Sequence, residues 1–145
     1  MQEKQFKYQN WIDELAEQGC LLPPLFPPRN MQACRFAFSF DEHRNHIPQY
    51  ISHPRRMLRD VAQGRGNTSL LALSCFDTEP HAERFYTNLR KAFKNVVSAV
   101  GDALAEGVLT DEDGLKTAES SNGHFDFYEY ENCDLNKTFK ITKLL

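Results

Sequence analysis

Residues 33–40 read Ala-Cys-Arg-Phe-Ala-Phe-Ser-Phe, and this stretch decides the class of fold. Bulky apolar residues alternate there with small or polar ones, which is the period of a β-strand. Phe36, Phe38 and Phe40 fall on one face, which we expect to be the core face, and Arg35 falls on the other. A strand with one apolar and one more polar face is typical of an antiparallel sheet.

The same alternation returns near the end of the chain. Residues 124–131 and 137–144 both have it, and the residues between them, 132–136, are turn-forming. Two alternating stretches joined by a turn predict a C-terminal β-hairpin. The acidic residues of its first strand and the lysines of its second would then pair across the strands.

The remaining segments predict helices, a strap and one buried strand. Helical spacing of apolar residues and good end signals favour helices over 5–18, 54–62 and 79–94. A short apolar run at 70–76 suits a buried strand, and four prolines make 21–30 an extended strap.

Residues 95–109 leave two interpretations open. Their valines favour a strand, although the preceding helix could also continue into them. We favour a break near Asn95 and a strand within 102–109, because Gly101 breaks a helix. The whole pattern predicts an α+β fold: one domain over 1–145, with its body at 33–145, a largely antiparallel sheet of four or five strands and two main helices.

Length and composition exclude several classes of protein. The chain has 145 residues, enough for one hydrophobic core, and 41% hydrophobic residues with eleven Phe exclude disorder. No apolar run is long enough to span a membrane, and the first residues lack a secretory pattern. Four scattered cysteines without a Cys-x-x-Cys pair favour free thiols. We therefore expect a cytoplasmic protein with no membrane partner.

The formal net charge of −3 conceals a strong segregation of charge. The basic segment, residues 29–65, has seven Arg against three acids, and the acidic segment, residues 102–134, has ten acids against one Lys. No lysine occurs between Tyr8 and Arg90. Arginine without lysine favours bidentate recognition of phosphate or carboxylate. The two segments could also simply pair with each other, and the sequence leaves both interpretations open.

The best candidate site lies within the basic segment. Histidine can exchange a proton near neutral pH, and arginine can neutralise a phosphate. The candidate anion-binding residues are His43, His46, Tyr50, His53, Arg55, Arg56, Arg59 and Arg65. Two histidines with an arginine would be enough to bind a ribose phosphodiester or to cleave it without a metal. We expect no metal, because the pair His43-x-x-His46 lies in a predicted loop without clear further ligands.

A second pattern involves three short elements in chain order. Arg35 lies on the first predicted strand, Thr68-Ser69 precede the next strand, and Glu129-Tyr130-Glu131 come late. This order resembles the Arg, Ser/Thr and Glu-x-Glu elements of arginine-type ADP-ribosyltransferases. The resemblance implies that the Arg and Ser hold a nicotinamide dinucleotide and that the second Glu supports the transfer. The usual Ser-Thr-Ser triplet is absent here.

Two functional hypotheses follow. The leading one is a small binding protein, with or without a larger assembly around it, that grips a nucleic acid, a nucleotide or an acidic protein partner through residues 43–65 and needs no cofactor. The alternative is a metal-independent enzyme on a nucleotide-containing substrate, either ADP-ribosyltransferase-like, with NAD, or ribonuclease-like. Its candidate catalytic residues are Arg35, His46, His53, Glu129 and Glu131.

Overall fold

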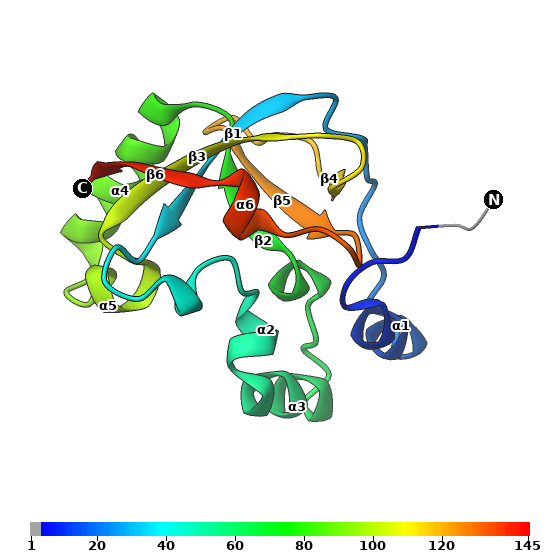
Figure 1. Ribbon diagram of the computed structural model, residues 1–145. Helices are drawn as coiled ribbons and strands as arrows, with labels where there is room; N and C mark the ends of the chain where they lie inside the picture. Colours follow the sequence, from blue (N-terminus) through cyan, green and yellow to red (C-terminus); the bar gives the residue numbers. More distant parts are fainter. Residues whose placement is uncertain (1–3) are drawn as a thin grey trace.

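The predicted strand at 33–40 becomes β1 (Met31–Ala37), which lies inside an antiparallel sheet. The structure is a computed structural model that describes residues 4–145. Within them six strands follow the spatial order β4-β5-β2-β1-β3-β6 (Figure 1). This confirms the α+β class and the antiparallel sheet, but residues 4–145 form more strands than the expected four or five, and six α-helices where two main helices were expected. The other strands are β2 (Leu73–Phe76), β3 (Ala103–Leu109), β4 (Gly114–Lys116), β5 (His124–Glu129) and β6 (Lys140–Leu144).

Both faces of β1 are covered, so the expectation of a single core face is wrong. Ala33 and Ala37 pack in one buried cluster with residues of β2, β3 and β5. On the opposite face, Cys34 packs with Phe76 and with Ala82 of the long helix α4 (Glu79–Ala92). The side predicted to be polar therefore also lies inside the protein, and Arg35 on it is only 8% exposed.

The sheet splits between β1 and β2, and this split creates the space for a candidate site. β1 pairs with β3 along its whole length, from Met31 opposite Leu109 to Ala37 opposite Ala103. In contrast, β1 and β2 share one residue pair, Cys34 opposite Phe76. The two strands diverge beyond that pair, and β2 remains joined to β5 on its other side. A gap between two central strands of a sheet leaves room for a cleft.

The predicted C-terminal hairpin does not form. β5 pairs with β2 and β4, whereas β6 pairs with β3 at the far edge of the sheet. The connection is not a tight turn, because it contains the short helix α6 (Leu135–Thr138), whose Leu135 is buried. Alternation identifies a strand and its faces but not its partner, so the pattern predicted both strands correctly and their pairing wrongly.

The helices largely follow the sequence, with shorter ends. α3 (Pro54–Ala62) has the predicted bounds, whereas α1 (Gln9–Glu17) begins after Phe6, which forms an isolated bridge with Tyr130. The proline-rich strap bridges Lys116 of β4 through Phe26, with hydrogen bonds of 2.8 and 2.9 Å. The remaining helical turns are η1 (Glu42–Arg44), α2 (Gln49–Ser52), η2 (Thr68–Leu71) and α5 (Val96–Val100).

Residues 95–109, for which the sequence left two interpretations, contain both a helix and a strand. α4 ends at Ala92, α5 forms one further turn, and β3 begins at Ala103. Gly101 lies between the last two with φ +114°, a conformation that side chains disfavour, and a Cβ there would meet the Ala37 carbonyl oxygen at 2.1 Å. The expected break near Asn95 and the strand within 102–109 are confirmed.

Candidate functional site

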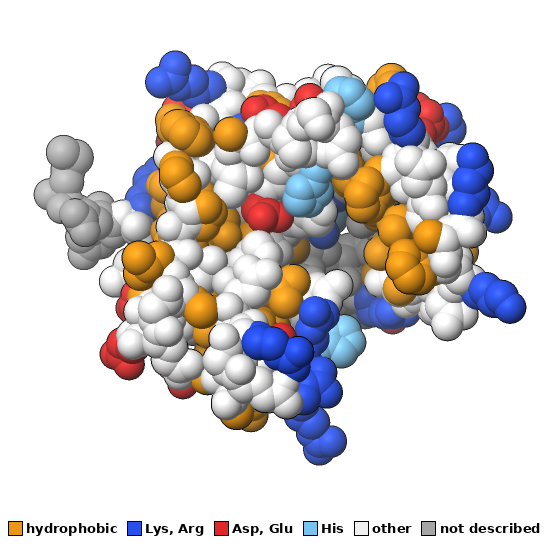
Figure 2. Space-filling view, turned by 180° about the vertical axis from the view of Figure 1, so that it is seen from behind, with side chains coloured by type: hydrophobic (Ala, Val, Ile, Leu, Met, Phe, Trp, Pro, Cys, Tyr) orange, Lys and Arg blue, Asp and Glu red, His pale blue; other side chains and the backbone are white. Residues whose placement is uncertain are grey.

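A cleft of about 410 Å³ opens where β1 and β2 diverge. Phe36 of β1 and Ser74 of β2, which would be neighbours in an unbroken ladder, both line it. About half of its wall is apolar, including Phe85 and Leu89 of α4 and Leu70 of η2, and the other half is polar or charged. Figure 2 shows the hollow on this face, with histidine and acidic side chains at its edge and a group of basic side chains nearby. Convergent polar groups beside apolar surface are typical of a small-molecule site.

Arg35 contributes a fixed guanidinium to this cleft. Its Nε donates to His46 Nδ1 at 3.0 Å, and its Nη1 donates to the Ser74 carbonyl oxygen. The second contact bridges the gap between β1 and β2. Within residues 4–145, the third guanidinium nitrogen, Nη2, has no protein acceptor, so it can donate to an anionic ligand. A guanidinium oriented in this way is preorganised to bind a phosphate.

His46 orients Arg35 and remains neutral. It follows Asn45, whose side chain bonds both the N–H and the carbonyl of Phe38 and so anchors the loop to the end of β1. Burial, and then the charge of Arg35, lower the pKa of His46 to about 3. Because Nδ1 accepts from Arg35, the neutral ring carries its proton on Nε2. The ring packs against Phe139, with the ring centres 5.2 Å apart.

Ser74, His124 and Asp126 form a polar group on the other side of the split. They come from the paired strands β2 and β5, where Ser74 lies opposite Asp126. The distance between Ser74 Oγ and His124 Nε2 is 2.6 Å, and that between His124 Nε2 and Asp126 Oδ1 is 3.8 Å. Burial raises the pKa of Asp126, and the nearby His124 opposes the rise. All three side chains line the cleft.

This group does not have the geometry of a serine-hydrolase triad. In such a triad the serine and the carboxylate bond opposite nitrogens of the imidazole, so that a proton can pass from one side to the other. Here both Ser74 and Asp126 lie nearest to Nε2 of His124. The arrangement instead offers a carboxylate that can stabilise positive charge, beside a hydroxyl that can hold a ligand.

The eight anion-binding candidates of the basic segment lie in different places. His46 is in the cleft, and Tyr50 is buried with its hydroxyl donating to Asp60 at 2.9 Å. His43 lines another hollow, and His53 is exposed beside Ser52. Three of the candidates gather around one hollow of about 470 Å³, namely Arg56, Arg59 and Arg65. Arg55 is exposed on the same helix and does not line that hollow.

The basic and acidic segments do not neutralise each other through ion pairs. Within residues 4–145, the ion pairs of the acidic segment involve Lys7, Lys116 and His124, and none joins it to an arginine of residues 29–65. Arg29 does contact the acidic segment, but through its backbone N–H, which donates to Asp111 Oδ1, and not through its guanidinium. Apart from Arg35 and Glu129, which are buried, the arginines of the basic segment and the acids of the acidic segment are exposed or half-buried.

The carboxylates named in the resemblance lie outside the cleft. Glu129 is buried and pairs with Lys7 Nζ at 2.7 Å, and burial raises its pKa although Lys7 opposes the rise. Glu131 is exposed beyond the end of β5. Thr68 is buried and donates to the Leu21 carbonyl, whereas Ser69 does line the cleft. The carboxylate that lies in the cleft is Asp126.

Sequence reasoning missed Ser74, His124 and Asp126. Ser74 sits within an apolar run that predicts a buried strand, which concealed its position at the split. His124 and Asp126 are two residues apart in a strand and so share a face, which was a usable signal. That signal shows a common face without showing that β5 lies beside β2.

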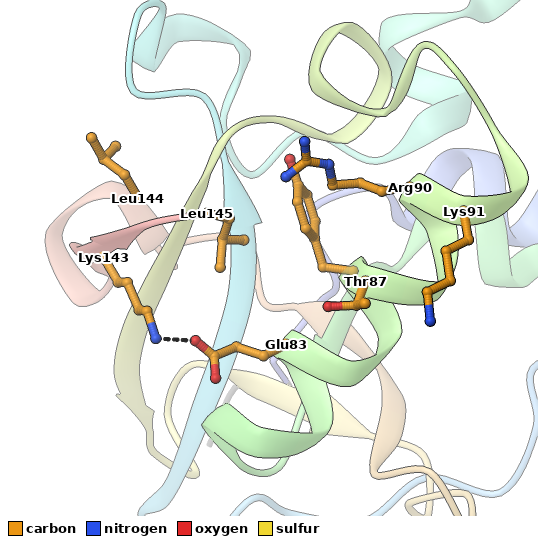
Figure 3. A pocket seen from close by; sticks show the side chains of 8 residues that line it. Glu83, Thr87, Arg90, Lys91, Lys143, Leu144 and Leu145 are labelled. Atoms are coloured by element: carbon orange, nitrogen blue, oxygen red, sulfur yellow. Dashed lines mark hydrogen bonds and ion pairs between the residues drawn. The ribbon is translucent and has the colours of Figure 1, made fainter.

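A larger hollow, of about 520 Å³, lies between α4 and β6 (Figure 3). Its cation Lys143 already pairs with Glu83 and lies 3.5 Å from Glu79. Arg90 and Lys91 lie on the exposed side of α4 there. Its buried polar group, the Tyr86 hydroxyl, already donates to the Gly101 carbonyl oxygen at 2.9 Å. The cleft between β1 and β2 brings together an arginine, two histidines, a serine and a carboxylate, so we take that cleft as the candidate site.

Comparison with known protein families, curated proteins and solved structures gives no match to this chain. Within residues 4–145, no group of three or more His, Cys, Asp or Glu is arranged to hold a metal ion. No helix of this part of the chain is long and apolar enough to cross a membrane. The geometry of the cleft is therefore the basis for a functional assignment.

Proposed function

We propose that the cleft binds a nicotinamide dinucleotide and that the protein is an ADP-ribosyltransferase-like enzyme that needs no metal. One observation carries the proposal: Arg35, Ser74 and the carboxylate of Asp126 meet in one cleft from the adjacent strands β1, β2 and β5. The resemblance implies an arginine and a serine that hold the dinucleotide and a glutamate that supports the transfer. In this proposal Ser74 and Asp126 take the places that sequence order gave to Ser69 and Glu131.

The charges of the cleft match those of the substrate. NAD combines an anionic pyrophosphate with a cationic nicotinamide. The cleft offers two guanidiniums, of Arg35 and Arg44, and the carboxylate of Asp126, which pairs with neither of them among residues 4–145. Arg35 would hold the pyrophosphate, and Asp126 would stabilise the positive charge that grows on the ribose. The apolar part of the wall, including Phe36, Phe85 and Leu89, suits the flat rings of the substrate.

The proposed reaction is a displacement at the ribose carbon that carries nicotinamide. The bond from that carbon to the nicotinamide nitrogen breaks, and its electron pair leaves with neutral nicotinamide. An oxygen or nitrogen of an acceptor forms the new bond and loses a proton, for which Asp126 is the nearest carboxylate in the cleft. With water as the acceptor, the same step releases nicotinamide and ADP-ribose.

The test is release of nicotinamide from NAD by the whole chain, with Asp126→Asn as the variant. This change keeps the shape of the side chain and removes its charge, and we expect the rate to fall about 10²-fold or more. Glu131→Gln is the matched control, because that carboxylate lies outside the cleft. NAD binding should persist in both variants, as measured by calorimetry. A wild-type protein that does not bind NAD, or an Asp126→Asn variant with full activity, would contradict the proposal.

The ribonuclease-like alternative has less support. A general acid must carry a proton near neutral pH, whereas His46 has a pKa of about 3 and an Nδ1 already bonded to Arg35. His53 lies outside the cleft, which leaves His124 without a second histidine beside it. The binding hypothesis for residues 43–65 does have a specific observation in its favour, because Arg56, Arg59 and Arg65 line one hollow.

A further inference from the structure

We propose that Arg56, Arg59 and Arg65 form a site for the phosphate backbone of a single-stranded nucleic acid, and that this strand is the acceptor for the reaction in the cleft. We call these three residues, with Asp60, Asn67 and Leu70 around the same hollow, the arginine hollow. The identity of the acceptor rests on the proposed function, whereas the binding of the strand does not.

Charge is the first argument. Three guanidiniums face one carboxylate in the hollow, and that carboxylate already accepts a hydrogen bond from the Tyr50 hydroxyl at 2.9 Å. Arg56 Nε lies 3.7 Å from Asp60, so Arg59 and Arg65 carry most of the unbalanced charge. Arg56 and Arg59 are three residues apart on α3 and therefore lie side by side. Guanidiniums in a row suit successive phosphates of a strand.

The chemistry of the lining favours phosphates over bases. Among residues 4–145, no aromatic side chain lines the hollow, so the described part of the chain offers no platform there on which bases could stack. Contacts to phosphate alone carry no sequence information. The hollow should therefore bind single strands of any sequence, with an affinity that depends strongly on salt.

Continuity with the cleft is the second argument. Leu70 lines both the arginine hollow and the cleft. Gln49 lines the cleft, and its Oε1 accepts a hydrogen bond of 2.5 Å from Arg56 Nη1. A strand held by the arginines would therefore continue past Leu70 toward the polar group of Ser74, His124 and Asp126. A nucleophilic oxygen or nitrogen of that strand would then bond to the ribose carbon as the bond from that carbon to nicotinamide breaks, and its proton would pass to Asp126.

The test measures fluorescence anisotropy of short labelled RNA and DNA strands with the whole chain. Three phosphate contacts on a single strand predict a log–log salt slope near −2, or about a 20-fold loss of affinity between about 50 and about 200 mM salt. In the variant Arg59→Ala/Arg65→Ala, with one contact left, that loss should shrink to about threefold. Arg84→Ala is the matched control, because it removes an exposed arginine of α4 that does not line the hollow.

Each outcome separates this inference from the proposed function. Weakened strand binding in the double variant, with unchanged nicotinamide release into water, supports the inference. NAD turnover without strand binding overturns the inference alone. Strand binding through the hollow without any NAD turnover supports the backbone site and overturns both the proposed enzyme and the acceptor. Competition by polyglutamate as effective as by RNA would mean that the hollow recognises an acidic protein, which also overturns the inference.

Discussion

Replacing His46 by Asn tests whether a neutral histidine holds Arg35 in place. Asparagine keeps an acceptor close to the position of Nδ1 and tolerates the left-handed backbone of this residue, where φ is +60°. It cannot titrate. The substitution therefore removes the proton equilibrium of His46 while keeping the contact to Arg35. The lost packing against Phe139 changes the stability by an amount that does not depend on pH.

The magnitude follows from the two states of the wild-type histidine. Burial and Arg35 lower the pKa of His46 to about 3 in the folded protein, against about 6.5 in the unfolded chain. Below about pH 6.5 the unfolded chain binds a proton that the folded protein does not bind, so the stability falls as the pH falls, until about pH 3. Between about pH 7 and about pH 5 the wild type should lose about 2 kcal/mol through His46.

Urea unfolding of both proteins across this pH range is the assay. Asp126 and Glu129 have raised pKa values and contribute with the opposite sign, but they are common to both proteins and cancel in the difference. We expect the wild type to lose about 2 kcal/mol more than His46→Asn between about pH 7 and about pH 5. Parallel stability profiles would refute the claim that His46 is buried as a neutral group.

Two further variants test the framework around the cleft. Lys7→Met should lower the free energy of unfolding by about 2–3 kcal/mol at neutral pH, because it leaves the buried Glu129 carboxylate unpaired. Adding Glu129→Gln should restore part of that loss. No change in the free energy of urea unfolding would contradict the pairing of Lys7 with Glu129. Gly101→Ala should cost more than about 2 kcal/mol, because φ is +114° and a Cβ would overlap the Ala37 carbonyl. Gly64→Ala, with a positive φ but open space, should cost only about 1–2 kcal/mol, and equal losses would refute the role of close packing.

The sequence allows the strands to be recognised but not their neighbours. Alternation depends on each residue and the one after it, so 33–40 and 124–131 could be identified as strands without knowing the fold. The pairing of strands depends on contacts between segments that are distant in the sequence, and the alternation of apolar and polar residues does not indicate which segments meet. The predicted hairpin shows the consequence, because three strands lie between β5 and β6 in the sheet.

The same distinction explains how much of the candidate site could be predicted. Arg35 and His46 stood out by their residue types, and they do touch each other. Ser74 and Asp126 acquire their importance from lying opposite each other on β2 and β5, next to the point where β2 leaves β1. No property of those two residues taken alone could indicate this. The resemblance to ADP-ribosyltransferases pointed to an arginine, a serine and a glutamate, and the proposed site has a different serine and an aspartate instead.

The segregation of charge along the chain gains a different meaning from this arrangement. The cleft takes Arg35 and His46 from the basic segment, and His124 and Asp126 from the acidic one. If Arg35 and Asp126 formed an ion pair, each would neutralise the charge of the other, and neither charge would remain to attract a ligand. Instead Arg35 is held by His46 and by a carbonyl of β2, and Asp126 lies beside His124. Keeping opposite charges apart in a partly buried cleft costs stability. Under the proposed function, a substrate that supplies an anion for one side and a cation for the other would offset that cost, whereas a simple anion would satisfy only one side.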